Sequence, residues 1–432
     1  MIGIVLFVVL ALVCLVVSRH AAFLIFTAGM ILFSRAFSHI SVGLYVTEYF
    51  MVLVLVSFLL VFFLKGSIRI VHIPFEKTLA ILFVIMMFDL ARGVLVYPDK
   101  SFVVRQSAIF YYALFYFLVP HICTSLDKIE HYFKVFFLMA VVVSLVGIFD
   151  IQWYTIGKFG YYYESLAFIF VAIAIVNQKA ILHINTRQWG ALILLSAVVL
   201  SSVRAAWMGI FIVVVFLYFS SYFGRYFNKM TEKIRLYGSI VFLVLLIFIG
   251  IFKFSLFESL AGKMLSILPG SRVVSVSSNN TKWRLIVWKD TLSEAVEKPL
   301  LGWGFGKKFI PPTIKKMGWG GSWRESEGGF QDPHNSFISI FYRTGFIGLI
   351  VFCGLLGSFI VRTMCVIRRL DDSVIKTYMT GLLLCIICIL GTSCFMVVLE
   401  GPFLGIFLWI AMGLIVSLER IDIKTRQTLL GI

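Results

Sequence analysis

Charged residues are scarce in this chain. They make up 14% of its 432 residues, whereas 61% are hydrophobic and the mean hydropathy is +1.01. A soluble protein of this length cannot hide so much apolar surface, because about half of an ordinary globular chain is apolar. The composition therefore excludes a soluble globular enzyme and indicates helices that face lipid.

Cysteine is absent from the longest polar stretch, residues 258–334. This absence excludes a disulfide framework and a Cys-ligated metal site in that stretch. Cys385 and Cys388 form a C-x-x-C elsewhere, inside the apolar run TGLLLCIICILG. We interpret both as small apolar residues of a helix rather than as a redox or metal motif.

Motifs that bind metals and nucleotides are also missing. No Asp-x-Asp occurs, and the nearest acidic pair, Glu325 and Glu327, is typical of solvated loop carboxylates. The glycines at 302, 304 and 306 lack the strand–turn–helix context of a dinucleotide site. No base-stacking motif accompanies the net charge of +17, so no nucleic-acid partner is indicated. We therefore expect neither a metal nor a cofactor.

Thirteen apolar runs are candidates for membrane helices. The first two are short, so twelve and thirteen spans both fit, and the side of the N-terminus stays open. No basic residue precedes the first run and no small-residue cleavage site follows it, so we interpret it as a retained span rather than a signal peptide. The runs are 2–17, 21–34, 46–64, 78–96, 102–119, 133–150, 161–177, 189–202, 205–223, 238–257, 335–361, 377–398 and 402–418.

Lysine and arginine are distributed unequally over the short connections between these runs. Most lie on one set of connections, which includes 362–376 and the C-terminal 420–426. The positive-inside rule makes that set cytoplasmic. We therefore divide the chain into transmembrane helices with short loops (1–257), one large periplasmic loop (258–334) and C-terminal helices with a cytoplasmic tail (335–432).

Ionisable residues gather in or near the outer ends of the predicted helices. A charge that faces lipid at the midplane costs at least about 2.5–3.5 kcal/mol, so each needs a partner or a wet cavity. Asp89 and Arg92 are spaced i and i+3 and can form a structural pair. Because the inner halves carry less charge, we favour a cationic cavity that opens outward, in which Arg92 and Arg105 bind an anionic headgroup such as a lipid-linked diphosphate. The residues are Arg35, Glu48, Asp89, Arg92, Arg105, Asp150, Glu164 and Arg204.

The large loop contains one helical pattern. Apolar residues recur at helical spacing from Leu285 to Val296, which predicts an amphipathic helix over 282–297 that is capped by Asn280 or Thr281. Its two tryptophans favour a position at the membrane interface.

His334 is the only histidine of the large loop, and it lies at the junction between the loop and the next span. An imidazole at a wet membrane boundary can act as a general base toward a sugar hydroxyl. The competing interpretation is helix capping by Asp332 or Asn335 beside an incidental histidine.

Three stretches of the chain carry a family resemblance. They are SSVRAAWMG (201–209), WRLIVWKDTLSEAVEKPLLGWGFGKKF (283–309) and DPHNSFISIFYRTGFIGLIVF (332–352). In this order, with many spans before them and two after, they resemble the O-antigen ligase and O-antigen polymerase family of bacterial polysaccharide assembly. The first 200 residues match that family only in hydropathy.

The resemblance implies an all-α polytopic membrane protein of the GT-C type. It implies a metal-independent, inverting glycosyltransferase of the bacterial inner membrane that takes a glycan from undecaprenyl diphosphate on the periplasmic face. A polymerase hands the glycan to another lipid-linked repeat and works beside a chain-length regulator, whereas a ligase hands it to lipid A–core. The YRTG sequence slightly favours a polymerase. A flippase for a lipid-linked glycan is the alternative from another class, although the chain shows no internal repeat.

The resemblance also implies roles for individual residues. Arg204 matches the arginine expected to bind the diphosphate, and Arg284 matches the loop arginine of the W-R element. His334 matches the histidine of the HN element, which is the base or the group that orients the acceptor. Asn335 and Arg343 belong to the same stretch, and we assign both to substrate binding.

Overall fold

The computed structural model describes residues 18–37, 52, 56, 72–149, 160–176, 184–200, 203–220, 276–309, 311–313, 333–401 and 404–430. All regular elements in these residues are α-helices. Five helices are long and apolar enough to cross a membrane, a bent pair makes a sixth, and four shorter apolar helices accompany them. The prediction of an all-α polytopic membrane protein is confirmed.

The helices follow the predicted apolar runs wherever the structure describes them. The runs 2–17, 46–64 and 238–257 lie outside the described residues, apart from positions 52 and 56. In chain order the helices are α2 (Arg19–Phe37), α4 (Glu76–Val96), α5 (Lys100–Gln106), α6 (Ala108–Tyr111), α7 (Leu114–Ile122), α8 (Leu126–Ile148), α9 (Gly160–Val176), α10 (Ile184–Leu200), α11 (Arg204–Ser220), α14 (Val276–Ala295), α17 (Ser336–Arg369), α18 (Ser373–Ser393) and α19 (Leu404–Leu430).

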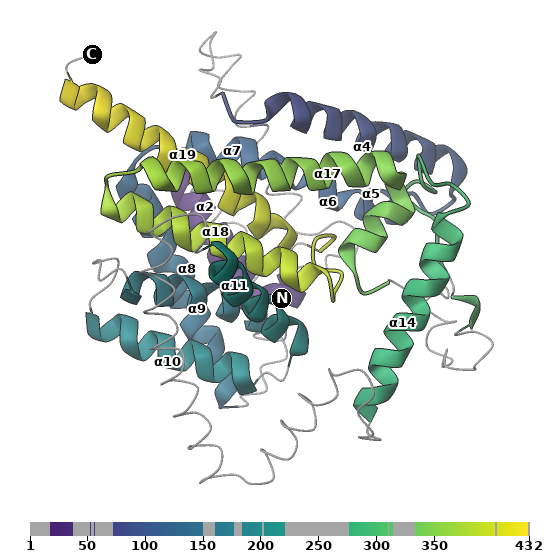
Figure 1. The fold of residues 1–432 in the computed structure, drawn as a ribbon, viewed down its shortest axis with the longest axis horizontal. Helices are drawn as coiled ribbons and strands as arrows, with labels where there is room; N and C mark the ends of the chain where they lie inside the picture. The colour runs from purple at the N-terminus through teal and green to yellow at the C-terminus, as the bar shows by residue number, and fades with distance from the viewer. Residues whose placement is uncertain are drawn as a thin grey trace.

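Helix α18 lies in the middle of the bundle. It packs against α9, α11, α17 and α19, and α19 in turn packs against α7. The apolar windows of α18 and α19 are each 83% buried, whereas that of α4 is 28% buried. Figure 1 shows α4 along the edge of the bundle, beside α17. The exposed side chains of α4, such as Val84 and Leu95, are those expected of a helix that faces lipid.

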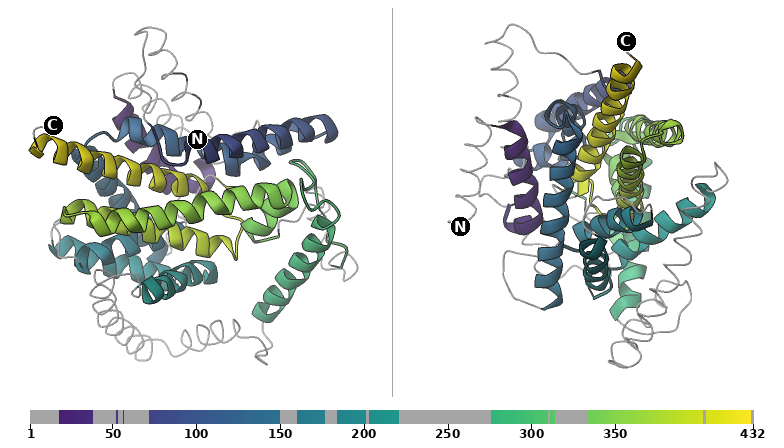
Figure 2. Two further views of the ribbon diagram at one scale, coloured as in Figure 1. Left: turned by 45° about the horizontal axis from the view of Figure 1, so that its top comes forward. Right: turned by 90° about the vertical axis from the view of Figure 1, so that its left-hand side faces the viewer.

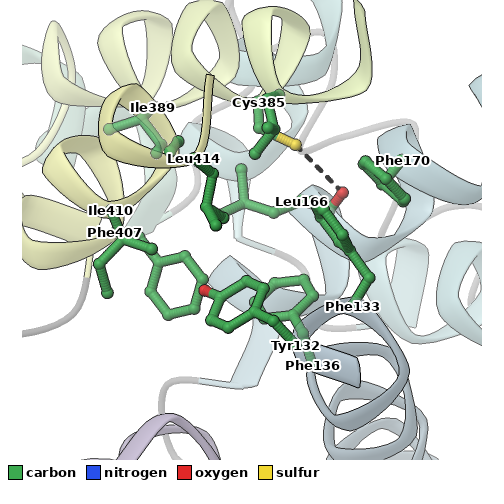
Figure 3. A pocket seen from close by; sticks show the side chains of 12 residues that line it. Tyr132, Phe133, Phe136, Leu166, Phe170, Cys385, Ile389, Phe407, Ile410 and Leu414 are labelled. Atoms are coloured by element: carbon green, nitrogen blue, oxygen red, sulfur yellow. Dashed lines mark hydrogen bonds between the residues drawn. The ribbon is translucent and has the colours of Figure 1, made fainter. Parts of the chain in front are cut away.

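Aromatic side chains fill the core between α8, α9, α18 and α19 (Figure 3). The rings of Phe133 and Phe170 stack with their centroids 4.0 Å apart. The Cys385 thiol donates to the Leu166 carbonyl at 3.5 Å, and both Cys385 and Cys388 are buried free cysteines, as expected of apolar helix residues. The gap that these side chains leave encloses about 20 Å³, which is too small for a sugar.

The predicted span 102–119 is not one straight helix. The chain bends by 42° between α5 and the stretch formed by α6 and α7. At the bend the Gln106 Oε1 accepts a hydrogen bond from the Gly306 N–H at 2.7 Å, and the Ser107 hydroxyl donates to the Val104 carbonyl at 2.8 Å. Polar side chains therefore break the helix and bind a distant loop there, which hydropathy cannot reveal.

Helix α14 begins earlier than the spacing predicts. The expected range was 282–297, but the helix runs over Val276–Ala295, so Asn280 and Thr281 lie inside it and do not cap it. Residues 276–281 offer several N-cap candidates and contain neither glycine nor proline, so the sequence does not fix which of them begins the helix. Figure 2 shows α14 leading away from the bundle, beyond the outer end of α17.

Candidate active site

Helix α17 begins behind a junction of polar residues. The Asn335 Oδ1 accepts hydrogen bonds from the Phe337 N–H at 2.9 Å and from the Ile338 N–H at 3.1 Å, which is N-cap geometry. Its Nδ2 donates to the Cys394 carbonyl at 2.8 Å. The capping interpretation therefore holds for Asn335, whose side chain is engaged by the main chain of two segments. Asp332, the other capping candidate, lies outside the described residues.

His334 has a backbone φ of +50°, in the left-handed region. A residue with a side chain is uncommon there, and the conformation costs about 1–3 kcal/mol. The chain is held on both sides of it. Asn335 fixes the helix start, and the Trp288 indole N–H donates to the Pro333 carbonyl at 2.5 Å. A strained residue held in this way is typical of functional sites.

Helix α14 brings its W-R element to this junction. The Trp283 ring lies edge-on to the His334 ring, with centroids 5.2 Å apart and an interplanar angle of 71°. Arg284 follows Trp283 directly and is half-buried. The structure therefore brings the Arg284 and His334 regions together through Trp283. Because Trp283 and Trp288 both contact residues 333–334, each has a partner inside the protein, and their position at the membrane interface stays a prediction.

Arg343 is buried in α17 beside a carboxylate. Its Nη1 lies 3.5 Å from the Glu400 Oε1, and the Glu400 Oε2 accepts from the Ser336 hydroxyl at 2.8 Å. The backbone N–H groups of Val398 and Leu399 donate to the Ser336 oxygen at 3.2 and 3.3 Å. Arg343 thus helps to tie the connection between α18 and α19 to the start of α17.

Helix α17 breaks at Gly345, where φ is +64° and ψ is −166°. The loop that follows α14 pairs with the main-chain groups that the break leaves open. Four hydrogen bonds of 2.8–3.3 Å join the two segments, from Trp303 to Tyr342, from Gly304 to Arg343, from Phe346 to Pro299 and from Ile347 to Leu300. A Cβ at Gly345 would overlap the Leu300 carbonyl, so only glycine permits this close approach.

Arg92 of α4 reaches the same loop. Its Nη2 lies 2.6 Å from the Asp89 Oδ1, 2.7 Å from the Leu301 carbonyl oxygen and 3.5 Å from the Arg343 carbonyl oxygen. The predicted pair of Asp89 and Arg92 is confirmed. The guanidinium also lies against Gly304, where a Cβ would crowd it. Arg92 therefore connects α4, the loop and α17.

Arg105 lies on α5 with an exposed side chain. The preceding Asp99 caps this helix by accepting from the Phe102 N–H at 3.0 Å. That hydrogen bond lowers the pKa of Asp99 below its ordinary value, and burial opposes it, while Lys308, 3.2 Å away, and Arg105 add to the lowering. This part of the surface stays strongly charged at neutral pH.

Arg204 is the first residue of α11, and its side chain lies outside the described part. Gly209, less than two turns further along, packs against Cys388 and Thr392 near the end of α18. Helix α18 leads from there to Cys394, which Asn335 contacts. The main chain of Arg204 is thus at the end of the bundle where α17 begins.

Sequence reasoning missed Glu400, Ser336 and the contact of Trp283 with the histidine. A glutamate between two strongly apolar runs was the available signal for Glu400, because a carboxylate at that place needs a partner. Among the residues that the structure describes, no group of three His, Cys, Asp or Glu side chains could hold a metal ion. Glu325 and Glu327 lie outside those residues.

A comparison with protein families gives one match. Residues 189–353 match a family model described as O-antigen ligase, and no curated protein matches the chain. Five of the site residues lie inside the matched range, namely Arg204, Arg284, His334, Asn335 and Arg343. Arg92 and Arg105 precede it. Over residues 189–353 the chain is thus similar to the O-antigen ligase family.

Proposed function

We propose that the protein transfers a glycan from undecaprenyl diphosphate to a sugar hydroxyl on the periplasmic face of the bacterial inner membrane. One observation carries the proposal. The Trp283 ring contacts His334 at the strained start of α17, and the loop arginine Arg284 is the next residue after Trp283 in the sequence. This supports the proposal, because glycosyl transfer from a diphosphate needs a base for the acceptor hydroxyl and cations for the departing diphosphate.

The proposed reaction is an inverting displacement that needs no metal. The acceptor oxygen forms a bond to the anomeric carbon while the bond from that carbon to the diphosphate oxygen breaks. His334 takes the proton of the acceptor hydroxyl, and the diphosphate leaves with the bonding electron pair. Because the diphosphate already activates the sugar, no soluble nucleotide is consumed.

Arg204 and Arg284 would stabilise the charge that grows on the diphosphate. A guanidinium binds two phosphate oxygens at once and stays charged at any relevant pH. Each well-placed donor contributes about 2.7–4 kcal/mol to the transition state, by analogy with oxyanion sites. Arg105, which is exposed, is the proposed additional contact to the donor.

Arg92, Asn335 and Arg343 have a different proposed role. Their side chains are engaged with Leu301, Cys394 and Glu400. We propose that they support substrate binding by holding the loop and the α17 start around the donor.

The acceptor separates polymerase from ligase. The YRTG sequence after the HN element favours a polymerase, which we propose as the principal activity. The description of the matched family model favours a ligase. A transporter of lipid-linked glycan is the third reading.

The deciding experiment uses purified full-length protein in vesicles with a labelled lipid-linked donor. Two acceptors compete in it, a second lipid-linked repeat and lipid A–core. A polymerase lengthens the lipid-linked glycan, a ligase labels the core, and a transporter releases no undecaprenyl diphosphate. Arg204→Ala and His334→Ala are expected to lower transfer strongly while the protein still inserts. Wild-type product levels in both variants would refute the proposed site.

A further inference from the structure

Two hollows lie at the end of the bundle opposite His334. The larger encloses about 420 Å³ between residues 72–75, which precede α4, Arg362 of α17 and residues 416–423 of α19. The smaller encloses about 240 Å³ between the end of α7 and α19. Arg420 of α19, which is half-buried, lines both of them.

The acidic residues nearest to Arg420 on α19, and Asp371 just after α17, are already paired. The Glu419 carboxylate binds the two terminal nitrogens of Arg362 at 2.8 and 2.7 Å. Asp422 and Asp371 lie 2.9 and 3.3 Å from nitrogens of Arg426. The carboxylates nearest in sequence to Arg420 therefore neutralise other arginines.

Arg420 is left with an uncompensated charge. Within the part of the chain that the structure describes, neither its side chain nor that of Lys424 makes a hydrogen bond or an ion pair. The two residues are spaced i and i+4, so they share one face of α19, and both line the smaller hollow. A third cation stands at its rim, because the Lys128 ammonium donates to the Thr124 hydroxyl at 3.1 Å and Thr124 lines this hollow too.

The hollows also have apolar walls. Phe75, Val416 and Ile423 line the larger, and Pro120 and Ile421 line the smaller. Basic residues that only orient the protein in the membrane can be fully exposed to water. A half-buried arginine between two partly apolar hollows instead suits an amphiphile whose phosphate meets the cations and whose acyl chains follow the apolar walls.

We propose that Arg420, together with Lys424 and Lys128, binds the phosphate of an anionic phospholipid. The positive-inside distribution of the chain assigns this end to the cytoplasmic surface, where anionic headgroups meet basic pockets between membrane helices. This lipid site is distinct from the glycan-transfer site at the opposite end and goes beyond the proposed activity.

The test titrates delipidated full-length protein with dioleoylphosphatidylglycerol and counts bound lipids by native mass spectrometry. We expect saturable binding to the wild-type protein. Binding to Arg420→Gln/Lys424→Gln should be about thirtyfold weaker, because each basic residue contributes roughly 1 kcal/mol to the attraction of an anionic lipid. Equally tight binding of dioleoylphosphatidylcholine would overturn the proposal, because that lipid carries no net charge. Displacement of the lipid by inorganic phosphate at equal concentration would overturn it as well, since the site would then bind the free anion.

The matched control is Arg368→Gln/Arg369→Gln. It removes two exposed charges from the same end of the bundle, at positions that line neither hollow. We expect it to keep wild-type affinity, and an equal loss in both double variants would overturn the proposal. If the glutamine pair fails to fold, Arg420→Lys/Lys424→Arg keeps both charges. Lipid binding must then persist in this variant, and its loss would count against the site.

Discussion

The guanidinium of Arg343 and the carboxylate of Glu400 form an ion pair that is nearly closed to solvent, with Nη1 3.5 Å from Oε1 and the side chains 7% and 9% exposed. The second oxygen of Glu400 accepts from the Ser336 hydroxyl in the first turn of α17. One carboxylate thus holds two turns of the helix that begins directly after His334 and Asn335. The position of the proposed base depends on this carboxylate.

Removal of Glu400 alone should destabilise the protein strongly. Glu400→Ala leaves the Arg343 charge buried without its counter-ion, which costs about 3–5 kcal/mol. The measurement is the midpoint of thermal unfolding of the purified protein. Arg343→Met/Glu400→Leu, which removes both charges, should recover most of the loss, because an apolar pair needs no counter-ion. If the double variant is as unstable as Glu400→Ala, the buried charge of Arg343 is not the cause of the lost stability.

Gly345→Ala should lower the unfolding midpoint by several degrees. Gly345 has a φ of +64°, and its added Cβ would overlap the Leu300 carbonyl, so strain of about 1–3 kcal/mol is added to lost loop contacts. Gly354→Ala is the matched control on the same helix, where a Cβ meets no atom within 4 Å. Helix propensity predicts that this control is neutral or slightly stabilised. Equal losses in both variants would argue against the importance of the break.

His334→Ala should lower the initial rate of glycan transfer by about 10²–10⁴-fold, the usual contribution of a general base. The assay uses saturating acceptor, so that weaker acceptor binding does not mimic slower chemistry. His131→Ala, at an exposed position of α8, is the control and should keep the wild-type rate. If transfer continues unchanged in His334→Ala, the histidine is not the base.

Asp99 should make a pH-dependent contribution to stability. The Phe102 N–H lowers the pKa of Asp99 from its ordinary 3.8, so the ionised carboxylate is favoured in the folded protein. Its stabilising effect is therefore complete above pH 3.8 and is lost as the pH falls through the lower, folded pKa. We expect Asp99→Ala to cost about 1 kcal/mol at pH 7, the value of an N-cap, and less at pH 3. Unfolding midpoints of both proteins over this range test it, and a constant difference would contradict it.

Hydropathy was sufficient to predict most of the membrane helices that the structure describes, because in lipid each backbone polar group must be satisfied inside its own segment. The pair of Asp89 and Arg92 followed from their spacing on one helix face. The sequence analysis also singled out Arg284 and His334, and the structure brings these two regions together. Their contact through Trp283 was not foreseen, since the amphipathic pattern of α14 indicated only a membrane interface.

The break of α17 could not be predicted from its own sequence. The stretch from Tyr342 to Gly348 contains Gly345 and Gly348, but it is continuous with an apolar span, and isolated glycines are tolerated inside helices, so they do not predict a break. The compensating groups come from Pro299 to Gly304, which are distant in the sequence. The sequence analysis predicted that Arg92 binds an anionic ligand. It could not foresee the hydrogen bond from Arg92 to the Leu301 carbonyl, because a main-chain partner distant in the sequence leaves no side-chain pattern.

The attachment of this loop to the broken helix α17 affects how the loop sequence can diverge among related proteins. Its four hydrogen bonds run between main-chain atoms, so they depend on glycine at 302, 304 and 345 but on few other side chains. Mutations at the exposed loop positions 296–301 can accumulate without releasing it from the membrane helix, whereas Phe305 is buried and must stay apolar. We expect relatives that polymerise or ligate different sugars to keep this docking while exchanging the residues around it, which would make the loop a transplantable unit.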